Sequence, residues 1–283
     1  MSAPYAEVIG DPVAHSKSPT IHGFWLERLG IAGRYDRRHI AGDALAGYLA
    51  AHRADPDWRG CNVTIPHKQA VLPLLDRIDP LAARIGAANI VVAEDGALVG
   101  YNSDAPGFLE PLRPWLGQRH LLRTSRVLGT GGAARAIAHA LADAGFVVIV
   151  AGRDLAKAEA LAAALPQAHA ATLARFAEPL AFDWGDLDGR LDIVVNATSC
   201  GMSGQPPLAI DFSNLPPGAI VYDAVYEPLE TPLLAEARAR GHPVVDGLSM
   251  LIGQARSAFR RFFGAGPPDD PASDAALRAL LTA

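Results

Sequence analysis

The chain has 283 residues, of which 50% are hydrophobic and 19% charged, and its formal net charge is -5. This length suffices for one large or two medium domains, and no Lys/Arg block stands out, so neither nucleic acid nor an anionic membrane is expected as a partner. No apolar run approaches the length of a membrane span, and the N-terminus lacks the regions of a secretion signal. We therefore expect a cytoplasmic protein that binds a small molecule.

The two cysteines, Cys61 and Cys200, have no metal-ligand spacing, so reduced thiols and no metal site are expected. Each lies at the end of an apolar strand, where a buried cysteine behaves as a small hydrophobic residue. Neither is predicted to be a nucleophile, because thiol reactivity needs an accessible, electropositive setting.

The first predicted strand, Tyr5 to Gly10, leads into a polar loop that contains Ser16 and Ser18. Pro19 then opens an amphipathic helix over Thr20 to Leu29. Ser18, directly before the proline, is placed to cap this helix. Alternatively, the two hydroxyls lie beside free backbone N–H groups and can hold a carboxylate. The local sequence favours the cap and leaves the anion site open.

Predicted strands at 33–40 and 58–65 alternate with a helix at 43–53, which is typical of a parallel sheet. The third strand runs into a proline turn that presents Lys68 at the start of the next helix. A lysine there is either a solvated first-turn residue or a group that lends charge to a ligand. The motif alone does not decide between the two.

Two apolar runs, 88–92 and 97–101, are separated by Glu94-Asp95-Gly96, whose Asp-Gly pair predicts a tight hairpin. A hairpin brings its two ends together. Asn89 at its start and Asp104 just past its end are therefore expected at the same end of the first domain, a position that suits a site better than a core.

A glycine turn follows the next predicted strand and precedes an alanine-rich helix and a further strand, which is the context that G-x-G-x-x-A requires. Gly129 permits the tight turn, Gly131 lets the backbone approach a pyrophosphate, and Ala134 allows close helix packing. The strand after the alanine-rich helix ends at Arg153, and an arginine at this position favours binding of the 2′-phosphate of NADP. Asp154 would repel that phosphate, although it also fits the N-cap of the helix that follows.

Two more strands are predicted at 191–195 and 220–226, and the first ends in Asn196-Ala197-Thr198-Ser199. Ligands bind at the carboxyl ends of such strands. A helix at 231–240, a short strand at 243–245, a long helix beginning near residue 246 and a short terminal helix complete the prediction.

Six motifs occur in the order found in the shikimate dehydrogenase family, which the chain resembles from Gly10 to about Phe259. They are Gly-Asp-Pro-Val-Ala-His-Ser-Lys-Ser-Pro at 10–19, Asn-Val-Thr-Ile-Pro-His-Lys at 62–68, Gly-Tyr-Asn-Ser-Asp at 100–104, Gly-Thr-Gly-Gly-Ala at 129–133, Asn-Ala-Thr-Ser at 196–199 and Asp-Gly-Leu-Ser-Met-Leu-Ile-Gly-Gln at 246–254. Any one of them is common, but six in order are specific.

The resemblance implies an α/β fold with a mixed-sheet substrate-binding and catalytic domain at 1–104 and a Rossmann-type, doubly wound NADP-binding domain at 105–247. Helices at 248–283 are expected to return to the first domain. The implied activity is the reversible, NADPH-dependent reduction of 3-dehydroshikimate to shikimate, a step towards chorismate and the aromatic amino acids. The active site is expected in the cleft of a monomer or homodimer.

The resemblance also implies roles for individual residues. Lys68 and Asp104 form the catalytic pair. Ser16 and Ser18 bind the substrate carboxylate with help from Tyr226, and the ring hydroxyls are surrounded by Thr64, Lys68, Asn89, Asp104 and Gln254. The cofactor is expected to contact Gly129, Thr130, Gly131, Gly132, Ala133, Arg153, Thr198, Gly247 and Met250.

The implied chemistry agrees with these residue types. Hydride transfer to a ring ketone builds negative charge on oxygen, which an ammonium can stabilise and then protonate. Which member of the Lys68 and Asp104 pair carries the proton stays open.

Four positions depart from the family pattern. Gly152 and Asp154 replace the Asn and Thr that often flank the phosphate-binding arginine, Ser103 replaces a threonine, and Ser249 stands where glycine is usual. The first two motivate an alternative, a quinate/shikimate or related cyclic polyol dehydrogenase with relaxed or NAD-type cofactor use. A non-catalytic sensor of the same fold is a third hypothesis, against which the intact catalytic pair argues.

Overall fold

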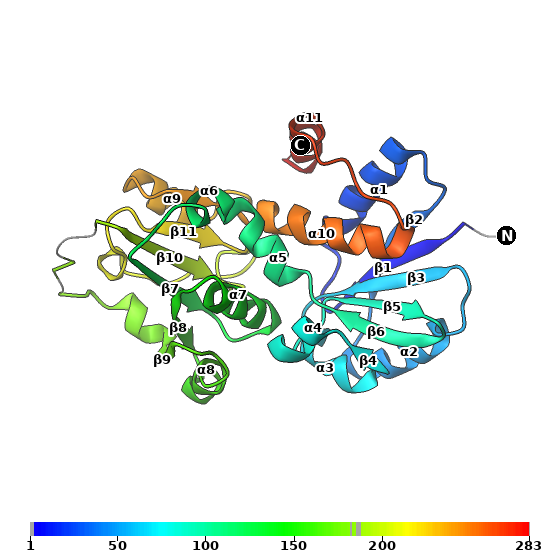
Figure 1. The fold of residues 1–283 in the computed structure, drawn as a ribbon, viewed down its shortest axis with the longest axis horizontal. Coiled ribbons are helices and arrows are strands. Elements are labelled where there is room, and N and C mark those ends of the chain that lie inside the picture. The colour runs from blue at the N-terminus through cyan, green and yellow to red at the C-terminus, as the bar shows by residue number, and fades with distance from the viewer. Residues whose placement is uncertain (1–2, 182, 185–187, 283) are drawn as a thin grey trace. The chain divides into compact units, whose positions relative to one another are not determined.

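The computed structural model describes residues 3–181, 183–184 and 188–282, and the chain divides into two compact units (Figure 1). Unit 1 comprises Met1–Asp104 and Ile252–Ala283, and unit 2 comprises Ala105–Leu251. Two helices, α5 (Asp104–Leu109) and α10 (Gly247–Phe263), run across the unit boundaries. No described helix is both long and apolar enough to cross a membrane.

Unit 1 is built on a mixed six-stranded sheet with the order β2-β1-β3-β5-β6-β4. β1 is parallel to β2 and β3, β5 is antiparallel to β3 and β6, and β4 is parallel to β6. The strands are β1 Tyr5–Gly10, β2 Arg34–His39, β3 Trp58–Val63, β4 Arg77–Ile78, β5 Ile90–Glu94 and β6 Ala97–Tyr101. The helices are α1 Ser18–Leu29, α2 Leu45–His52, α3 His67–Ala70, α4 Pro80–Ile85 and α11 Pro271–Thr282, with 3₁₀ turns at Gly42–Ala44 and Leu72–Leu74.

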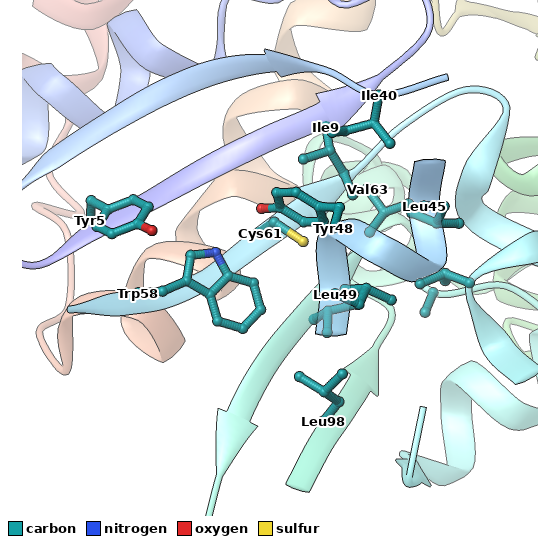
Figure 2. Packing of buried hydrophobic residues seen from close by; sticks show 13 residues of the cluster. Tyr5, Ile9, Ile40, Leu45, Tyr48, Leu49, Trp58, Cys61, Val63 and Leu98 are labelled. Carbon is teal, nitrogen blue, oxygen red and sulfur yellow. The ribbon is translucent and has the colours of Figure 1, made fainter. Parts of the chain in front are cut away.

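Successive residues of β1 point to opposite sides of the sheet, and all of them are buried. Both faces of the sheet are therefore covered. Ile9 lies in one core cluster with Leu45 and Leu49 of α2, as Figure 2 shows. Val8 lies in another cluster with Phe262 of α10. The end of the chain therefore completes the core that its beginning starts.

The predicted hairpin is confirmed. β5 and β6 pair antiparallel, with Glu94 opposite Ala97. The two turn residues, Asp95 and Gly96, have φ angles of 53° and 78°, as a turn that matches the twist of the strands requires. This hairpin is what makes the sheet mixed rather than parallel.

Unit 2 is built on a parallel sheet with the order β12-β11-β10-β7-β8-β9. This is the doubly wound order. Successive strands are added on one side of β7 up to β9 and on its other side from β10 onwards, and ligands bind at the carboxyl ends of the strands near that switch point. The strands are β7 Leu122–Leu128, β8 Val147–Gly152, β9 Ala168–Thr172, β10 Arg190–Asn196, β11 Ile220–Asp223 and β12 Val244–Val245. The helices are α6 Arg113–Leu116, α7 Gly132–Asp143, α8 Leu155–Ala162 and α9 Pro232–Ala239, with 3₁₀ turns at Glu110–Leu112, Leu173–Ala177 and Phe212–Asn214.

Candidate active site

One edge of the unit 1 sheet carries most of the predicted substrate residues. The parallel strands β1 and β3 both end there, and Ser16 and Lys68 follow them in the chain. Because β5 runs antiparallel to β3, and β6 antiparallel to β5, Asn89 before β5 and Asp104 after β6 reach the same edge. Side chains that are far apart in the sequence therefore meet.

Lys68 faces Asp104. Its Nζ donates a hydrogen bond to Asp104 Oδ2 at 2.5 Å, and only 13% of the lysine side chain and 5% of the aspartate side chain are exposed. The short helix α3 that carries Lys68 is anchored by His67, whose Nε2 lies 2.7 Å from the carbonyl oxygen of Ile40. Lys68 is thus a partly buried, paired cation and not a solvated first-turn residue.

Asn89 connects the Lys68–Asp104 pair to α10. Its Nδ2 donates to Asp104 Oδ1 at 3.0 Å, to Ser103 Oγ at 3.0 Å and to Gln254 Oε1 at 3.2 Å. The hairpin had predicted that Asn89 and Asp104 lie together, and this is confirmed. Gln254, 165 positions further along the chain, joins them because α10 packs on the same sheet.

Two neighbours of Asp104, to which the sequence assigned no role, hold this cluster in place. Asn102 Oδ1 accepts from the Asp104 backbone N–H at 3.0 Å, and its Nδ2 donates to the Ala87 carbonyl at 2.9 Å. The Ser103 backbone N–H donates to Asn89 Oδ1 at 2.7 Å. The Asn-x-Asp spacing at a helix start is the signal for the first of these contacts, since asparagine bonds the backbone two residues on.

The serine pair is buried but does not cap α1 as the local sequence favoured. Ser18 is the first residue of α1, its preceding residue Lys17 makes no side-chain cap, and Ser16 Oγ instead accepts from the Ser18 N–H at 3.3 Å. The loop is held from outside: Arg37 Nε donates to the Ser16 carbonyl at 2.8 Å, and Lys17 Nζ donates to the Leu281 carbonyl at 2.7 Å. The Ser18 hydroxyl therefore does not cap the helix.

Thr64 reaches the same edge through a close approach at Gly10. The Thr64 N–H donates to the Ile9 carbonyl at 2.9 Å. A Cβ added at Gly10 would lie 2.4 Å from Thr64 Cγ2 and 2.8 Å from the Ile65 carbonyl oxygen. Only glycine at the end of β1 leaves room for this loop.

A buried polar chain lies behind these residues and was not apparent from the sequence. Tyr35 Oη donates to Asn62 Oδ1 at 2.6 Å, and Asn62 Nδ2 donates to the Asn89 carbonyl at 3.1 Å. Burial raises the pKa of Tyr35 well above its ordinary value, so the phenol remains a hydrogen-bond donor. The backbone at Asn89 is thereby tied to β2 as well as to β3.

The glycine turn of unit 2 has the geometry of a dinucleotide site. Gly129 has a φ angle of 128°, and a Cβ there would lie 2.7 Å from the Ala197 carbonyl oxygen. Gly131 caps α7, which begins at Gly132, and a Cβ added at Gly131 would meet nothing within 4 Å. Ala134 is fully buried. The turn thus leaves open space at a helix N-terminus, where backbone N–H groups favour a phosphate.

Arg153 is exposed directly after β8, where a 2′-phosphate is expected. The preceding residue, Gly152, makes room for a neighbour, since its Cβ would lie 2.8 Å from Thr130 Cγ2. Asp154 caps α8 as predicted, accepting from the Lys157 N–H, and its carboxylate lies 3.8 Å from Lys157 Nζ. Its charge is therefore partly offset by a lysine.

The predicted cofactor residues Thr198, Gly247 and Met250 lie at the carboxyl end of β10 and at the start of α10, and the predicted substrate residue Tyr226 follows β11. Thr198 is half-buried in the turn after β10, and its backbone N–H lies 3.3 Å from the Cβ position of Gly129. A Cβ at Gly247 would lie 2.5 Å from the Val225 carbonyl oxygen. Met250 is buried and Tyr226 is half-buried.

Neither cysteine forms a disulfide. Cys61 is fully buried, and burial raises the pKa of its thiol above the ordinary value. A protonated, buried thiol is unreactive. Cys61 therefore has the packing role that the sequence predicted.

Comparison with known proteins identifies the family. A family model described as the shikimate dehydrogenase substrate binding domain matches residues 8–91. The shikimate dehydrogenase (NADP(+)) of Sphingopyxis alaskensis is 51% identical, and the match covers 100% of this chain and 98% of the relative. This chain belongs to the shikimate dehydrogenase family. A family member from Methylobacterium radiotolerans is 47% identical over 96% of this chain and 95% of its own.

Solved structures of family members agree with the fold. Shikimate 5-dehydrogenase from Thermus thermophilus, in complex with NADP(H) and shikimate, is 39% identical with a TM-score of 0.80, covering 98% of this chain and 99% of its own. Quinate dehydrogenase from Corynebacterium glutamicum, in complex with NAD, is 32% identical with a TM-score of 0.83, covering 99% of both chains. The predicted fold class, with its mixed-sheet and Rossmann-type parts, is confirmed.

Proposed function

We infer that this protein is an NADP-dependent oxidoreductase that reversibly reduces 3-dehydroshikimate to shikimate. The relatives named above support the reaction and the cofactor. The observation that carries it in this chain is the pairing of Lys68 with Asp104 at 2.5 Å, with Asn89 and Gln254 bonded into the same cluster. A non-catalytic sensor would have no need for a buried, bonded ammonium at this edge.

Unit 1 supplies the substrate site in this proposal. The hydroxyls of Ser16 and Ser18 bind the carboxylate. Thr64, Asn89 and Gln254 bind the ring hydroxyls. A site lined with such partners rejects an analogue that lacks a hydroxyl, because its own buried polar groups are then unpaired.

Lys68 and Asp104 act on the reacting oxygen. When NADPH is bound it supplies the hydride for the ring ketone. As the hydride arrives at carbon, negative charge develops on the ketone oxygen. The Lys68 ammonium stabilises that charge, and the pair of Lys68 and Asp104 delivers the proton. Asp104 keeps the ammonium oriented, and in the reverse direction the pair receives the hydroxyl proton.

Unit 2 supplies the cofactor site. The open space at Gly131 and the N-terminus of α7 fit a pyrophosphate, and exposed Arg153 fits a 2′-phosphate. Thr130, Gly132 and Ala133 complete the turn, while Thr198, Gly247 and Met250 contact the rest of the cofactor. A cytoplasmic location, and action as a monomer or homodimer, are further parts of the proposal.

The direct test is a steady-state assay of shikimate oxidation with NADP. Turnover at a rate ordinary for a dehydrogenase is expected, and an absence of turnover by folded protein would reject the proposal. The proton carrier is to be read from the pH dependence of kcat in wild type and Asp104→Asn.

The second candidate is a quinate/shikimate dehydrogenase that accepts NAD. Gly152 and Asp154 on either side of Arg153 favour it, as does the likeness to a quinate dehydrogenase solved with NAD. The values of kcat/KM for both acids with both cofactors separate the two functions. A preference for quinate with NAD would replace the first proposal by the second.

A further inference from the structure

A buried carboxylate joins the ends of two strands in unit 2. Asp223, the last residue of β11, is 0% exposed. Its Oδ1 accepts from Asn196 Nδ2 at 2.9 Å and from the Val225 N–H at 3.0 Å, and its Oδ2 accepts from Thr231 Oγ1 at 2.7 Å. An ionised carboxylate only accepts hydrogen bonds, and three donors point at it.

Asp223 thereby sets the orientation of Asn196. Asn196 Nδ2 donates to the Asp223 carboxylate and to the Cys200 carbonyl, each at 2.9 Å, so Asn196 Oδ1 faces the other way. There it accepts from the Thr198 N–H at 3.0 Å and from Thr198 Oγ1 at 2.7 Å. Thr198 Oγ1 in turn accepts from the Cys200 N–H at 3.0 Å. The shape of the turn after β10 therefore depends on a side chain from β11.

Both segments that Asp223 holds lie against glycines of the proposed cofactor site. The turn after β10 packs on Gly129, whose Cβ would lie 2.7 Å from the Ala197 carbonyl oxygen. The segment after β11 packs on Gly247, whose Cβ would lie 2.5 Å from the Val225 carbonyl oxygen. A small rotation of either segment would change the space that these glycines leave.

The charge state of Asp223 is sensitive to conditions. Burial raises its pKa to about 6, while the hydrogen bonds from Thr231, Val225 and Asn196 oppose the rise. Charged groups on the neighbouring elements are engaged elsewhere: Glu230 pairs with Arg238 at 3.2 Å on the surface near α9, Asp246 after β12 accepts from Ser249, and Asp192 lies towards the other end of β10. Protonation of Asp223 would place a fourth hydrogen at a carboxylate to which three donors already point, so one of the three hydrogen bonds would be disturbed.

We propose that Asp223 is a positioning residue for the cofactor site, which holds the Thr198 turn against Gly129 through Asn196. The inference rests on the proposed NADP-dependent function. Asp223→Asn keeps the shape but has one acceptor oxygen and an NH₂ group, so it cannot accept all three bonds. We expect the Kd for NADP to rise about tenfold at pH 7.5, because a buried donor that loses its acceptor is costly.

The test is calorimetric titration of NADP into wild type and Asp223→Asn at pH 7.5 and pH 5.5. Protonation of Asp223 weakens binding to wild type only, so the ratio of the two Kd values falls from about 10 to about 3 at the lower pH. The 2′-phosphate of the cofactor also titrates near pH 6, but it affects both proteins equally. A purely structural loss would leave the ratio unchanged with pH.

Asp192→Asn is the matched control. Asp192 is also a buried carboxylate of unit 2, bonded by Thr124 Oγ1 and 3.5 Å from Arg190 Nε. The Asp192→Asn variant should bind NADP with the same pH dependence of Kd as wild type. If Asp223→Asn fails to fold, Asn196→Ser tests the same connection from β10, because a serine cannot reach both Thr198 and Asp223. This variant should raise the Kd for NADP to a similar extent.

Three results would count against the proposal. Wild-type affinity in folded Asp223→Asn, or a Kd ratio that does not change with pH, would overturn the role of Asp223 alone. Wild type that neither binds NADP nor oxidises shikimate would overturn the proposed function, and this inference with it.

Discussion

At the residue scale, Lys68 and Asp104 hold each other within a shell of neutral amides. Asp104 accepts from Lys68 through one oxygen and from Asn89 through the other. Little of either side chain is exposed, so water screens their attraction less than it screens a surface pair. The ammonium is therefore already oriented before substrate arrives.

Replacing Lys68 by alanine removes the charge that stabilises the developing oxyanion. We expect kcat to fall by roughly 10²- to 10⁴-fold, with the Kd for NADP retained. Steady-state kinetics and calorimetry check this. Arg53→Ala is the control, since Arg53 pairs with Asp76 at 2.9 Å on the surface of the same unit and should leave activity unchanged. A Lys68→Ala enzyme within tenfold of wild type would contradict the assignment.

Asp154 is the residue whose negative charge we expect to oppose the 2′-phosphate of NADP. Asp154→Thr keeps an N-cap for α8 but removes the carboxylate next to Arg153. We expect the ratio of kcat/KM for NADP to that for NAD to rise about threefold, because an exposed charge is largely screened.

Arg153→Ala should move the same ratio the other way, by about tenfold or more, since a charge-assisted bond to the phosphate is lost. Both changes are measured with shikimate at saturation. An unchanged ratio in both variants would place the phosphate elsewhere.

At the element scale, the two glycines of the turn between β7 and α7 are expected to have different roles. Gly129 is needed for the turn to fold, and Gly131 is needed for the cofactor to bind. Gly129 needs a left-handed φ angle and lacks room for a side chain, whereas Gly131 has an ordinary φ of -75° and open space around it. Alanine at Gly129 is strained by its own backbone and by the Ala197 carbonyl. Alanine at Gly131 is not.

We therefore expect Gly129→Ala to lower the stability of the protein, on the order of 2 kcal/mol, and to abolish NADP binding. Gly131→Ala should melt like wild type but bind NADP more weakly, since its methyl group occupies the space expected for the pyrophosphate. Thermal unfolding and NADP titration of both variants test this. Equal melting temperatures for the two would refute the distinction.

Elements were predictable where local chemistry was strong. The Asp-Gly hairpin and the Asp154 cap were confirmed, because turn and cap preferences act within a few residues. The preference for Ser18 as a helix cap was wrong, since α1 begins one residue earlier than a proline at the first position implies. β9 was missed, because Ala168–Thr172 is rich in alanine and pairs only through its neighbour β8.

At the scale of the whole molecule, residues 252–283 return to complete unit 1. The ring of His22 on α1 stacks on Tyr35 of β2 at 3.9 Å and lies 5.8 Å from the ring of Phe259 of α10. His22 is 0% exposed, and neither ring nitrogen has a hydrogen-bond partner among the described residues. Burial lowers its pKa to about 3, so the folded protein holds it neutral.

This histidine should make the protein acid-sensitive. Between pH 6.5 and 3 the unfolded chain binds a proton at His22 that the folded chain does not, so stability is lost as pH falls. His22→Phe removes this term. From pH 7 to pH 5 the free energy of unfolding of the variant should gain about 2 kcal/mol relative to wild type, measured by urea denaturation. A difference that does not change with pH would show that folding does not lower the pKa of His22.

The sequence by itself determined most of the elements in their order, the dinucleotide turn, the hairpin and the kinds of residues in the site. Together with six ordered motifs these were enough for the family and its reaction. The physical reason is that hydrophobic periodicity, glycine turns and helix caps act over short stretches of chain, which the sequence displays directly.

Apart from Asn89 and Asp104, which the predicted hairpin brings together, only the tertiary structure decided which side chains meet. The bonds of Asn89 to Gln254, of Lys17 to the Leu281 carbonyl and of Asp223 to Asn196 join residues 165, 264 and 27 positions apart. Strand order and pairing direction bring them together, and both follow from burying two faces of a sheet at once. No local pattern in the chain encodes that outcome, because it depends on packing between distant segments.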